Sequence, residues 1–449
     1  MAELLHPRSP DGTYYDERET WPREEMRAWQ LERIQTQVAH AYRNSAFYRR
    51  KLDAAGVKPE DILTLDDIRK LPFTTKDELK QDQHDNPLYG TVSALGPEQA
   101  MRLHFTSGTT GRPVHVLDTP NDFQGFYRSY ARGLYGMGIR PDDVVMCAFG
   151  YGPWIGFWSG FYAAQDVGCL VIPVGGMTTE QRIDIIEAYG VTVLGCTPSY
   201  ALHMAETARQ LGKDLSKSKI RITWHTGEPG AAIPSTRKKI EDAYGARVCD
   251  LPGLTEIAAW GFSCSHESGL DHVHEDYVYP EVLNTETGDP VGPGEEGELV
   301  FTSLYRQALP LLRYRTRDIV RVADRLCSCG RTLFSIEGGV IGRLDDMKKI
   351  RGVIVYPTSI EEAVRRYQEV EEYQVRIWRK NNLDEVTVLI DTGNQVAQEN
   401  LQQVVKTMKD DLRQKIGIRI EVEAAEPGSL PRWDHKARRV KDERNEVPF

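Results

Sequence analysis

The first residues suited to chemistry form the stretch "TSGTTGRP", in which residues 107–111 comprise three hydroxyl side chains and two glycines. A turn of this composition offers backbone N–H groups and hydroxyl donors with little steric obstruction, and it suits anionic oxygens such as those of phosphates. Apolar residues alternate with polar ones in "AMRLHF" before the turn and recur in "PVHVLD" after it, which predicts a strand on each side. Walker and dinucleotide loops run into a helix with other glycine spacings, so neither fits. Because these residue types are common in turns, a plain polar hairpin remains the alternative.

Composition and charge limit the class of protein. The chain has 449 residues, more than the ~250–300 at which single hydrophobic cores stop growing, so at least two domains are expected. Its 40% hydrophobic and 27% charged residues fit a folded globular protein. A net charge of -10 argues against nucleic acid or an anionic membrane as the main partner. No apolar run approaches the ~20 residues of a membrane span, and "MAELLHPRSPDG" lacks a signal core, so a cytoplasmic protein is expected.

Hydrophobic periodicity divides the chain into two regions. Between residues 140 and 253, short apolar runs such as "DVVMCAF" and "VTVLGC" alternate with helical stretches, which predicts an α/β domain with largely parallel strands. From residue 352 the pattern is strand, helix, strand, strand, helix, strand, the order of a small ferredoxin-like α+β unit. The charged, glycine-flanked segment 342–352 suits an exposed connector. We therefore expect a large N-terminal domain, residues 1–343, and a small C-terminal domain, residues 344–449.

Four further motifs follow the 107–111 loop along the chain. They are "GLTE" at residues 253–256, "YRTRD" at 314–318, "GRLDD" at 342–346 and a late lysine in "LPRWDHKARRV". This series resembles the signature motifs of adenylate-forming enzymes, which use ATP to convert a carboxylate into an acyl-adenylate. The stretches "GYGPW", "TGEPG" and "RGVIVYPTSIEE" are most similar to the phenylacetate-CoA ligase branch, and the resemblance covers nearly the whole chain. It implies a large multi-layer α/β domain, with a small, mobile C-terminal domain that carries the catalytic lysine.

The resemblance assigns the reacting groups. An anionic carboxylate must approach an anionic α-phosphate, so catalysis depends on positioned positive charge. Lys436 matches the family's catalytic lysine, expected to bridge the carboxylate and an α-phosphate oxygen; a solvated surface lysine is the alternative. Glu256 of "GLTE" resembles the acid associated with Mg²⁺, an ion that takes oxygen ligands shared with phosphates. Its alternative role is to begin a helix after Thr255.

Further positions resemble the nucleotide site of the family. Asp318 would accept hydrogen bonds from both ribose hydroxyls, which suits an ionised carboxylate, and Arg343 resembles a second ribose or phosphate contact. The predicted ATP- and AMP-binding residues are Ser107, Gly108, Thr109, Thr110, Gly111, Gly227, Glu228, Pro229, Asp250, Gly253, Leu254, Thr255, Asp318 and Arg343. Three positions depart from the family pattern. Pro252 replaces the aromatic residue that usually stacks on adenine, Arg112 replaces the more frequent lysine, and Arg317 replaces the usual glycine.

The hinge and the acid pocket are the remaining expectations for the active site. Asp345 matches the position about which the family's small domain rotates between adenylation and thioester formation, carrying Lys436 away; exposed linker charge explains Asp345 equally well. Tyr151 and Trp154, beside a glycine turn, are the candidate pocket residues, and an aryl acid would suit them. The spacing of a buried helix face is shared by Trp154, Phe157, Trp158, Phe161 and Tyr162, so core packing explains most of them at least as well.

The seven cysteines do not resemble a secreted disulfide framework, because their number is odd and the chain is long. Cys264 and the C-x-C pair at 327–329 could combine with a histidine in the tetrahedral N/S set that Zn²⁺ favours. Relatives commonly carry a histidine at a position like that of His272, so the resemblance singles it out, and His266 and His274 remain alternatives. The predicted ligands are Cys264, His272, Cys327 and Cys329. Four protein ligands leave no position for water, so the site would be structural, and unligated thiols are the alternative.

Together these features favour an ATP-dependent ligase that adenylates an aryl or arylacetic acid and passes the acyl group to CoA, releasing AMP and pyrophosphate. A stand-alone AMP-forming ligase that delivers the acyl group to a small amine or hydroxyl is the close alternative. A non-catalytic nucleotide sensor is the alternative from another class. The expected cofactors are ATP, Mg²⁺, CoA and structural Zn²⁺, and the expected partner is a small carboxylic acid. The identity of the acid and the oligomeric state, including a homodimer, stay open.

Overall fold

The computed structural model describes residues 12–106, 112–150, 152–380, 383–393, 396–433 and 436–444. The chain forms two compact units, each built from segments distant in sequence. The first unit comprises Met1–Gly176, Thr192–Gly195 and Cys249–Gly339, and the second comprises Met177–Val191, Cys196–Val248 and Val340–Phe449. Among the described residues, no helix combines the length and apolar character needed to span a membrane.

The N-terminal helices of the first unit are bounded by capping side chains. They are α1 (Arg23–Asn44), α2 (Ala46–Ala55) and α3 (Lys76–Asp85). Ser45 separates α1 from α2 and accepts a hydrogen bond from the Tyr48 N–H. Thr75 and Glu78 form a capping box at the start of α3. The position at which α3 begins therefore follows from local sequence.

The predicted alternation of strands and helices is present in the first unit. Its elements in this region are β1 (Arg102–Phe105), β2 (His115–Asp118), α4 (Pro120–Gly136), β3 (Val144–Cys147), α5 (Ile155–Val167), β4 (Leu170–Pro173) and β5 (Val193–Cys196). β1 and β2 are antiparallel, with Arg102 opposite Asp118. β3 pairs in parallel with both β4 and β5. This pairing fits the predicted parallel α/β character.

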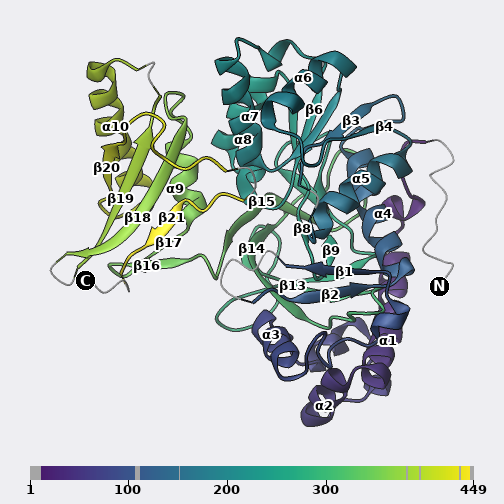
Figure 1. The fold of residues 1–449 in the computed structure, drawn as a ribbon. Helices are drawn as coiled ribbons and strands as arrows, with labels where there is room; N and C mark the ends of the chain where they lie inside the picture. Colours follow the sequence, from purple (N-terminus) through teal and green to yellow (C-terminus); the bar gives the residue numbers. More distant parts are fainter. Residues whose placement is uncertain are drawn as a thin grey trace. The chain divides into compact units, whose positions relative to one another are not determined.

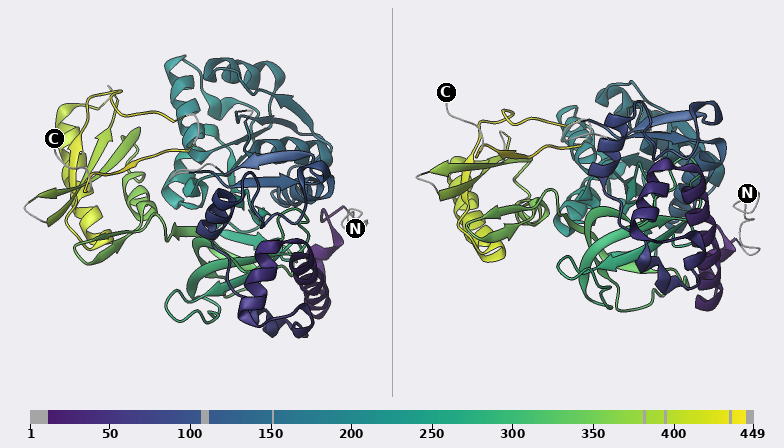
Figure 2. Two further views of the ribbon diagram at one scale, coloured as in Figure 1. Left: turned by 60° about the horizontal axis from the view of Figure 1, so that its bottom comes forward. Right: turned by 90° about the horizontal axis from the view of Figure 1, so that it is seen from below.

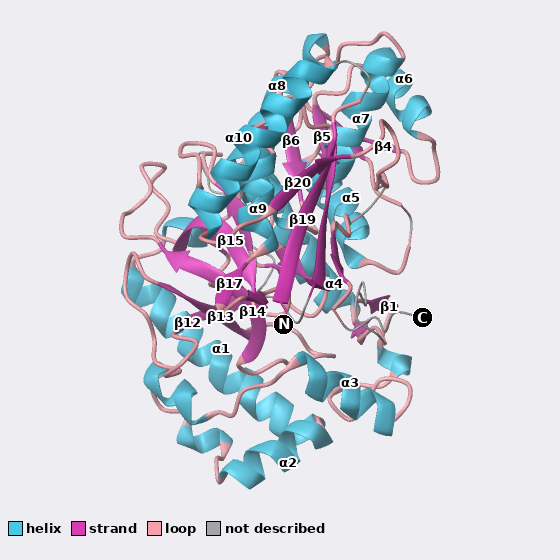
Figure 3. Cartoon of the chain, turned by 90° about the vertical axis from the view of Figure 1, so that its left-hand side faces the viewer, coloured by secondary structure: helices cyan, strands magenta, loops and turns pink. Residues whose placement is uncertain are grey.

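The C-terminal part of the first unit is largely antiparallel. Its strands are β7 (Arg247–Asp250), β8 (Gly253–Leu254), β9 (Ala258–Ala259), β10 (Gly261–Ser263), β11 (Leu270–Val273), β12 (Val278–Leu283), β13 (Glu296–Ser303), β14 (Tyr314–Val322) and β15 (Ser335–Arg343); β7 and β15 each cross between the units along the chain. β13 pairs with β12 and β14, and β11 pairs with β10 and β15. Helices α1 and α3 lie beside β13 and β14 (Figure 3).

The second unit begins with helices that flank a buried strand. These elements are α6 (Thr179–Tyr189), α7 (Pro198–Gln210), β6 (Ile222–His225) and α8 (Pro234–Tyr244). The Thr197 hydroxyl caps α7, and Pro198 occupies its first turn. The Tyr244 hydroxyl on α8 donates to the Ala201 carbonyl on α7 at 2.8 Å, so the two helices are joined by a buried hydrogen bond. The short 3-10 helices among the described residues are η2 (Glu17–Thr20), η3 (Pro59–Asp61), η4 (Leu65–Lys70), η5 (Pro97–Gln99), η6 (Leu215–Lys217) and η7 (Pro229–Ala232).

The predicted small α+β module forms the remainder of the second unit. Its elements are β16 (Lys348–Ile350), β17 (Val353–Val355), α9 (Pro357–Val364), β18 (Glu372–Lys380), β19 (Leu383–Asp391), α10 (Gln398–Ile416), β20 (Glu421–Ala424) and β21 (Val440–Asp442). The sheet order is β20-β19-β18-β21, with β18 and β19 as its long strands (Figures 1 and 2). Met408 and Leu412 of α10 share one buried core with Val388 of β19.

One strand of this module differs from the prediction. β17, expected as the first strand of the sheet, pairs with β16 instead, and β21 supplies the fourth strand by pairing in parallel with β18. Arg351 and Gly352, between β16 and β17, have φ of 50° and 84°. Two left-handed residues form the tight turn that closes a two-residue hairpin, so β17 folds back on the residues before it.

Candidate active site

The stem of the 107–111 loop is fixed by reciprocal hydrogen bonds. The Thr106 N–H donates to the Val114 carbonyl, and the Val114 N–H donates to Thr106 Oγ1, each at 3.0 Å. The predicted pair of strands around the loop is therefore present. Residues 107–111 themselves lie outside the described residues, so their phosphate-binding role stays a prediction.

Glu256 lies buried beside a lysine and a tyrosine that the sequence did not indicate. Its Oε1 is 3.0 Å from Lys76 Nζ and accepts a hydrogen bond from the Tyr314 hydroxyl at 3.1 Å. Burial favours a raised pKa, but the Lys76 charge and these hydrogen bonds outweigh it and hold the pKa of Glu256 below its usual value. Glu256 is thus an ionised carboxylate, the kind of oxygen donor that Mg²⁺ takes. The alternative that Glu256 begins a helix is wrong, because it stands in the turn between β8 and β9.

The amino-acid sequence gives little indication that Lys76 and Tyr314 contact Glu256. Lys76 is the first residue of α3, some 180 positions from Glu256 in the sequence, and belongs to none of the motifs. Tyr314 opens the "YRTRD" motif at the start of β14, but that motif was interpreted through Asp318. A contact of such sequence separation depends on the tertiary fold and leaves no periodic pattern.

β14 also carries Asp318. Asp318 is buried, and its N–H donates to Thr316 Oγ1 at 3.0 Å. The preceding Arg317 has a φ of 67°, a left-handed conformation that favours glycine. Its N–H donates to Oε1 of the buried Glu298 at 3.3 Å, near a shift in the β13–β14 register. This backbone geometry gives a physical reason why glycine is usual at the Arg317 position.

The predicted adenine-side residues 250–255 lead into the β8–β9 hairpin. Asp250 is buried, and its N–H donates to Ser263 Oγ at 2.8 Å. A Cβ added at Gly253 would lie 3.0 Å from the Ala258 carbonyl oxygen, so strand packing favours a glycine there. Leu254 pairs with Ala258 across the hairpin. The backbone that precedes Glu256 is therefore closely packed.

In the second unit, the structure brings Lys436 beside the predicted 227–229 segment. Gly227 has a φ of 93°, and a Cβ added there would lie 3.5 Å from Lys436 Cε. Glu228 accepts the Ser199 N–H at 2.7 Å through Oε1 and the Ala437 N–H at 3.0 Å through Oε2. One carboxylate thus links the residue after Lys436 to the start of α7. This tether was missed from the sequence, where Glu228 was assigned to the nucleotide.

Arg343 and Asp345 lie at the end of β15 and in the turn after it. Arg343 Nη2 and Asp345 Oδ2 are 3.8 Å apart, and about half of the Asp345 side chain is exposed. A Cβ added at Gly342 would lie 2.6 Å from the Tyr356 ring, so this position requires a glycine. Both the hinge and the exposed-linker explanations fit these contacts.

The aromatic residues around α5 separate into two kinds. Trp154 precedes α5 and is 43% exposed, whereas Phe157 is buried in the core. The Trp158 indole donates to the Gly152 carbonyl at 3.0 Å, and the Tyr162 hydroxyl accepts from Arg102 at 3.2 Å. Packing therefore accounts for these three, and Trp154 keeps its place as a pocket candidate. Tyr151, the other candidate, lies outside the described residues.

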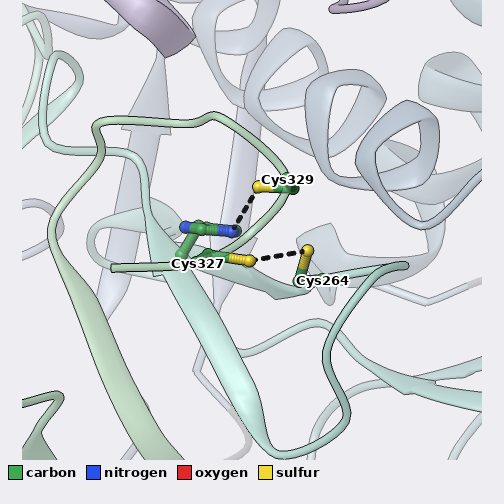
Figure 4. A group of neighbouring side chains, drawn as sticks. Cys264, Cys327 and Cys329 are labelled. Atoms are coloured by element: carbon green, nitrogen blue, oxygen red, sulfur yellow. Dashed lines mark hydrogen bonds between the residues drawn. The ribbon is translucent and has the colours of Figure 1, made fainter. Parts of the chain in front are cut away.

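The predicted metal ligands are brought together in the first unit. One donor atom from each of Cys264, His272, Cys327 and Cys329 lies within 4.8 Å of the others, and all four side chains are buried. The sulfur atoms of Cys264 and Cys327 are 3.4 Å apart, and Cys329 Sγ is 3.4 Å from His272 Nε2 (Figure 4). The other ring nitrogen of His272 lies 3.0 Å from Ser335 Oγ, which orients the imidazole.

The competing histidines are engaged differently. His274 stacks on Phe262 with ring centroids 5.1 Å apart. His266 donates its backbone N–H to Cys264 Sγ at 3.4 Å. A hydrogen bond from Cys264 holds the pKa of Cys329 below its usual value, so Cys329 is the thiolate of this pair, the form that binds metal.

Comparison with known proteins places this geometry in a family. The family model "AMP-binding enzyme" matches residues 23–305, and "AMP-binding enzyme C-terminal domain" matches residues 352–444. The chain is 37% identical over 443 residues to the phenylacetate-coenzyme A ligase of Escherichia coli (strain K12), covering 97% of this chain and 99% of that enzyme. The chain belongs to the phenylacetate-CoA ligase family of AMP-binding enzymes. A second relative, the phenylacetate-coenzyme A ligase of Thermus thermophilus, is 36% identical over 448 residues, covering 96% of this chain and 99% of the relative.

Solved structures agree with membership in the phenylacetate-CoA ligase family. The chain is similar to 2-hydroxyisobutyryl-CoA ligase in its postadenylation state, with a TM-score of 0.92 and 28% identity, covering 98% of this chain and 94% of that one. Its similarity to the same enzyme in the thioesterification state has a TM-score of 0.74, with 29% identity and coverage of 98% and 95%. The α/β fold class and the family expected from the sequence are therefore confirmed.

Replacing Lys76 with glutamine is expected to destabilise the protein by about 2 kcal/mol at pH 7, because Glu256 loses its charge partner while remaining buried. The folded pKa of Glu256 lies below its unfolded value of about 4.3, so the stabilisation is present above that pH and is lost as the pH falls. Melting curves from pH 7.5 down to 2.5 should therefore show a Tm difference that shrinks once the pH falls below about 4.3. Lys80→Gln, which removes only an exposed pair with Asp77, should leave Tm unchanged. A Tm difference that is constant with pH would refute this role of Lys76.

Proposed function

We propose that this chain is an AMP-forming ligase that activates an aryl or arylacetic acid with ATP and transfers the acyl group to CoA. The observation that carries the proposal is its similarity to the phenylacetate-coenzyme A ligase of Escherichia coli over 97% of this chain and 99% of that enzyme. Because the similarity extends over both family models, it supports both halves of the reaction.

The proposed first step forms an acyl-adenylate. A carboxylate oxygen attacks the α-phosphorus of ATP, the bond from that phosphorus to the bridging oxygen breaks, and pyrophosphate leaves with the electron pair. Lys436 would contact the carboxylate and an α-phosphate oxygen, and residues 107–111 would hold the β- and γ-phosphates. Glu256 would be a ligand of Mg²⁺, which when bound supplies neutralisation of phosphate charge. Preorganised positive charge is expected to be the largest contribution to this step.

The remaining predicted contacts would hold the nucleoside. Asp318 would accept hydrogen bonds from the ribose hydroxyls, with Arg343 as a second contact. The adenine would lie along residues 227–229, Asp250 and residues 253–255. The left-handed backbone at Gly227 supports this proposal, because it places the 227–229 segment beside Lys436, the proposed catalytic cation.

The proposed second step makes the thioester. The CoA thiolate attacks the acyl carbon, the bond from that carbon to the AMP oxygen breaks, and AMP leaves. We propose that residues 344–449 act as a separate domain which rotates about Asp345 between the two steps. The half-exposed position of Asp345, in the turn directly after β15, supports a hinge.

The acid pocket would be formed by Tyr151 and Trp154. The exposed ring of Trp154 supports this proposal, since an aromatic surface left partly uncovered suits an aryl group. Such a pocket favours acids with a ring over short aliphatic acids.

The purified protein with Mg²⁺ is expected to exchange pyrophosphate into ATP only when an acid such as phenylacetate is present. Adding CoA should give the acyl thioester, measured by mass. If the product forms with a small amine or hydroxyl instead, the acceptor in this proposal is wrong. Absence of exchange across a panel of aryl and arylacetic acids would favour a nucleotide sensor.

Lys436→Ala is expected to slow adenylation by about 100-fold or more, because it removes the cation at the reacting oxygens. Thioester formation from supplied acyl-adenylate should be spared, since that step does not need this charge. The matched control is Lys441→Ala, an exposed lysine paired with Glu443 on the same segment, which should leave both half-reactions unchanged. Equal loss of both half-reactions in Lys436→Ala would remove the assignment.

We further propose that Cys264, His272, Cys327 and Cys329 bind one structural Zn²⁺. Tetrahedral Zn–S bonds of ~2.3 Å place two sulfur atoms about 3.8 Å apart, comparable with the separations found here. The Tyr14 hydroxyl donates to the Cys329 carbonyl at 2.9 Å, so the metal would also stabilise the loop that anchors the N-terminal segment. We also propose a cytoplasmic location, which is supported by the reduced state of all seven described cysteines.

Protein prepared without added metal is expected to contain about one equivalent of zinc by elemental analysis. The double variant Cys327→Ser/Cys329→Ser should lose the zinc and melt at lower temperature. Cys249→Ser, a buried cysteine outside the cluster, should keep the full zinc content. A metal-free protein whose Tm is unaffected by chelator would show that the four residues bind no structural metal.

A further inference from the structure

His104, on β1, has a role that the nucleotide and acid-binding assignments do not include. It is 3% exposed, and its Nδ1 lies 3.0 Å from the Pro153 carbonyl oxygen. The next residue, Phe105, donates its N–H to the same oxygen at 3.1 Å. Two successive residues of β1 therefore hold one carbonyl of the segment that leads into Trp154.

The protonation state of His104 follows from its neighbours. A carbonyl oxygen only accepts hydrogen bonds, so Nδ1 must carry the proton. Burial lowers the pKa of His104 to about 4, which leaves the ring neutral and Nε2 without a proton at pH 7. Nε2 is 3.5 Å from Asp118 Oδ2, and neither atom has a hydrogen-bond partner among the described residues. The contact with Pro153 is thus the hydrogen bond that fixes this ring.

The other carboxylate oxygen of Asp118 is bound to an arginine. This oxygen, Oδ1, accepts a hydrogen bond from the buried Arg306 guanidinium. Burial raises the pKa of Asp118 to about 6 in spite of the Arg306 charge. Arg306 therefore fixes the Asp118 carboxylate beside the His104 ring, and the ring has little freedom to turn from Pro153.

Further hydrogen bonds hold the segment around Pro153 and strand β1. Trp158 of α5 donates to the Gly152 carbonyl at 3.0 Å, so the segment is held at Gly152 by α5 and at Pro153 by β1. Thr106, two residues after His104, is locked to Val114 at the stem of the 107–111 loop. A short path of described hydrogen bonds thus joins the acid-pocket segment to the base of that loop.

We propose that His104 is a positioning residue for adenylation. Through the Pro153 carbonyl it keeps the acid-pocket segment in register with the strand that enters the phosphate-binding loop, so that the carboxylate meets the α-phosphate in a reactive geometry. Small displacements of reacting groups lower reaction rates by large factors, so the His104–Pro153 hydrogen bond is expected to affect the rate of adenylation. The inference rests on the proposed function, because it assumes that residues 107–111 hold phosphates and that Trp154 lines the acid pocket.

The test compares two amides at position 104. The amide nitrogen of His104→Asn can occupy the place of Nδ1 and donate to Pro153, whereas that of His104→Gln falls at the place of Nε2. In acid-dependent ATP–pyrophosphate exchange, His104→Gln is expected to raise the acid KM and lower kcat by ~10-fold each, and His104→Asn to stay within ~3-fold of the unmodified protein. Thioester formation from supplied acyl-adenylate should be unchanged in both variants.

Controls separate positioning from stability. The two variants should melt within a few degrees of one another, because each places one amide in the same buried space. His115→Gln, on the neighbouring strand, removes a histidine that contacts the Leu88 carbonyl and should behave as the unmodified protein. Equal rates for His104→Gln and His104→Asn, or equal loss in both half-reactions, would overturn the inference about His104 but leave the proposed function standing. An unmodified protein without acid-dependent exchange would overturn the proposed function and the inference together.

Discussion

Like-charge repulsion between a carboxylate and a triphosphate is the constraint on which an adenylating site depends. A buried acid such as Glu256 adds to that negative charge unless cations surround it. Lys76 and Tyr314 keep Glu256 ionised within the first unit, so the proposed ligand for a divalent cation carries a negative charge. Lys436 lies beside the 227–229 segment of the second unit, on a C-terminal segment tethered by Glu228, and is the cation proposed to contact the reacting oxygens. In the proposed reaction, the arrangement of these charges determines the chemistry more than any nucleophile does.

Backbone conformation at the site is as restricted as charge. Arg317 adopts a left-handed conformation directly before Asp318, at a cost of roughly 1–3 kcal/mol that the surrounding strands must offset. Gly342 lies against the Tyr356 ring at the start of the segment that contains Asp345. These positions combine strain or close packing with a residue assigned to the nucleotide or the hinge. Such clustering is typical of functional sites, where surrounding structure holds unfavourable geometry in place.

Much of the fold could be predicted because periodicity and caps are local. The alternation of strands and helices, the α+β character of the C-terminal region and the spacing of the cysteines all leave short-range patterns. The pairing of β17 was missed because the turn at Arg351 and Gly352 was not recognised as a hairpin. Lys76 and His104 were missed for a different reason. Lys76 contacts Glu256 and His104 contacts Pro153, and both partners are distant in sequence. A single lysine or histidine forms no sequence pattern from which its partner could be predicted.

The central claim is that the acid becomes covalently attached to AMP before it reaches the thiol. Turnover with phenylacetate labelled with ¹⁸O in both carboxylate oxygens tests it directly, because the attacking oxygen must remain on phosphorus when the thiolate displaces AMP. Mass analysis is predicted to find one ¹⁸O in AMP for each thioester formed. Thioester formed with unlabelled AMP would contradict the account.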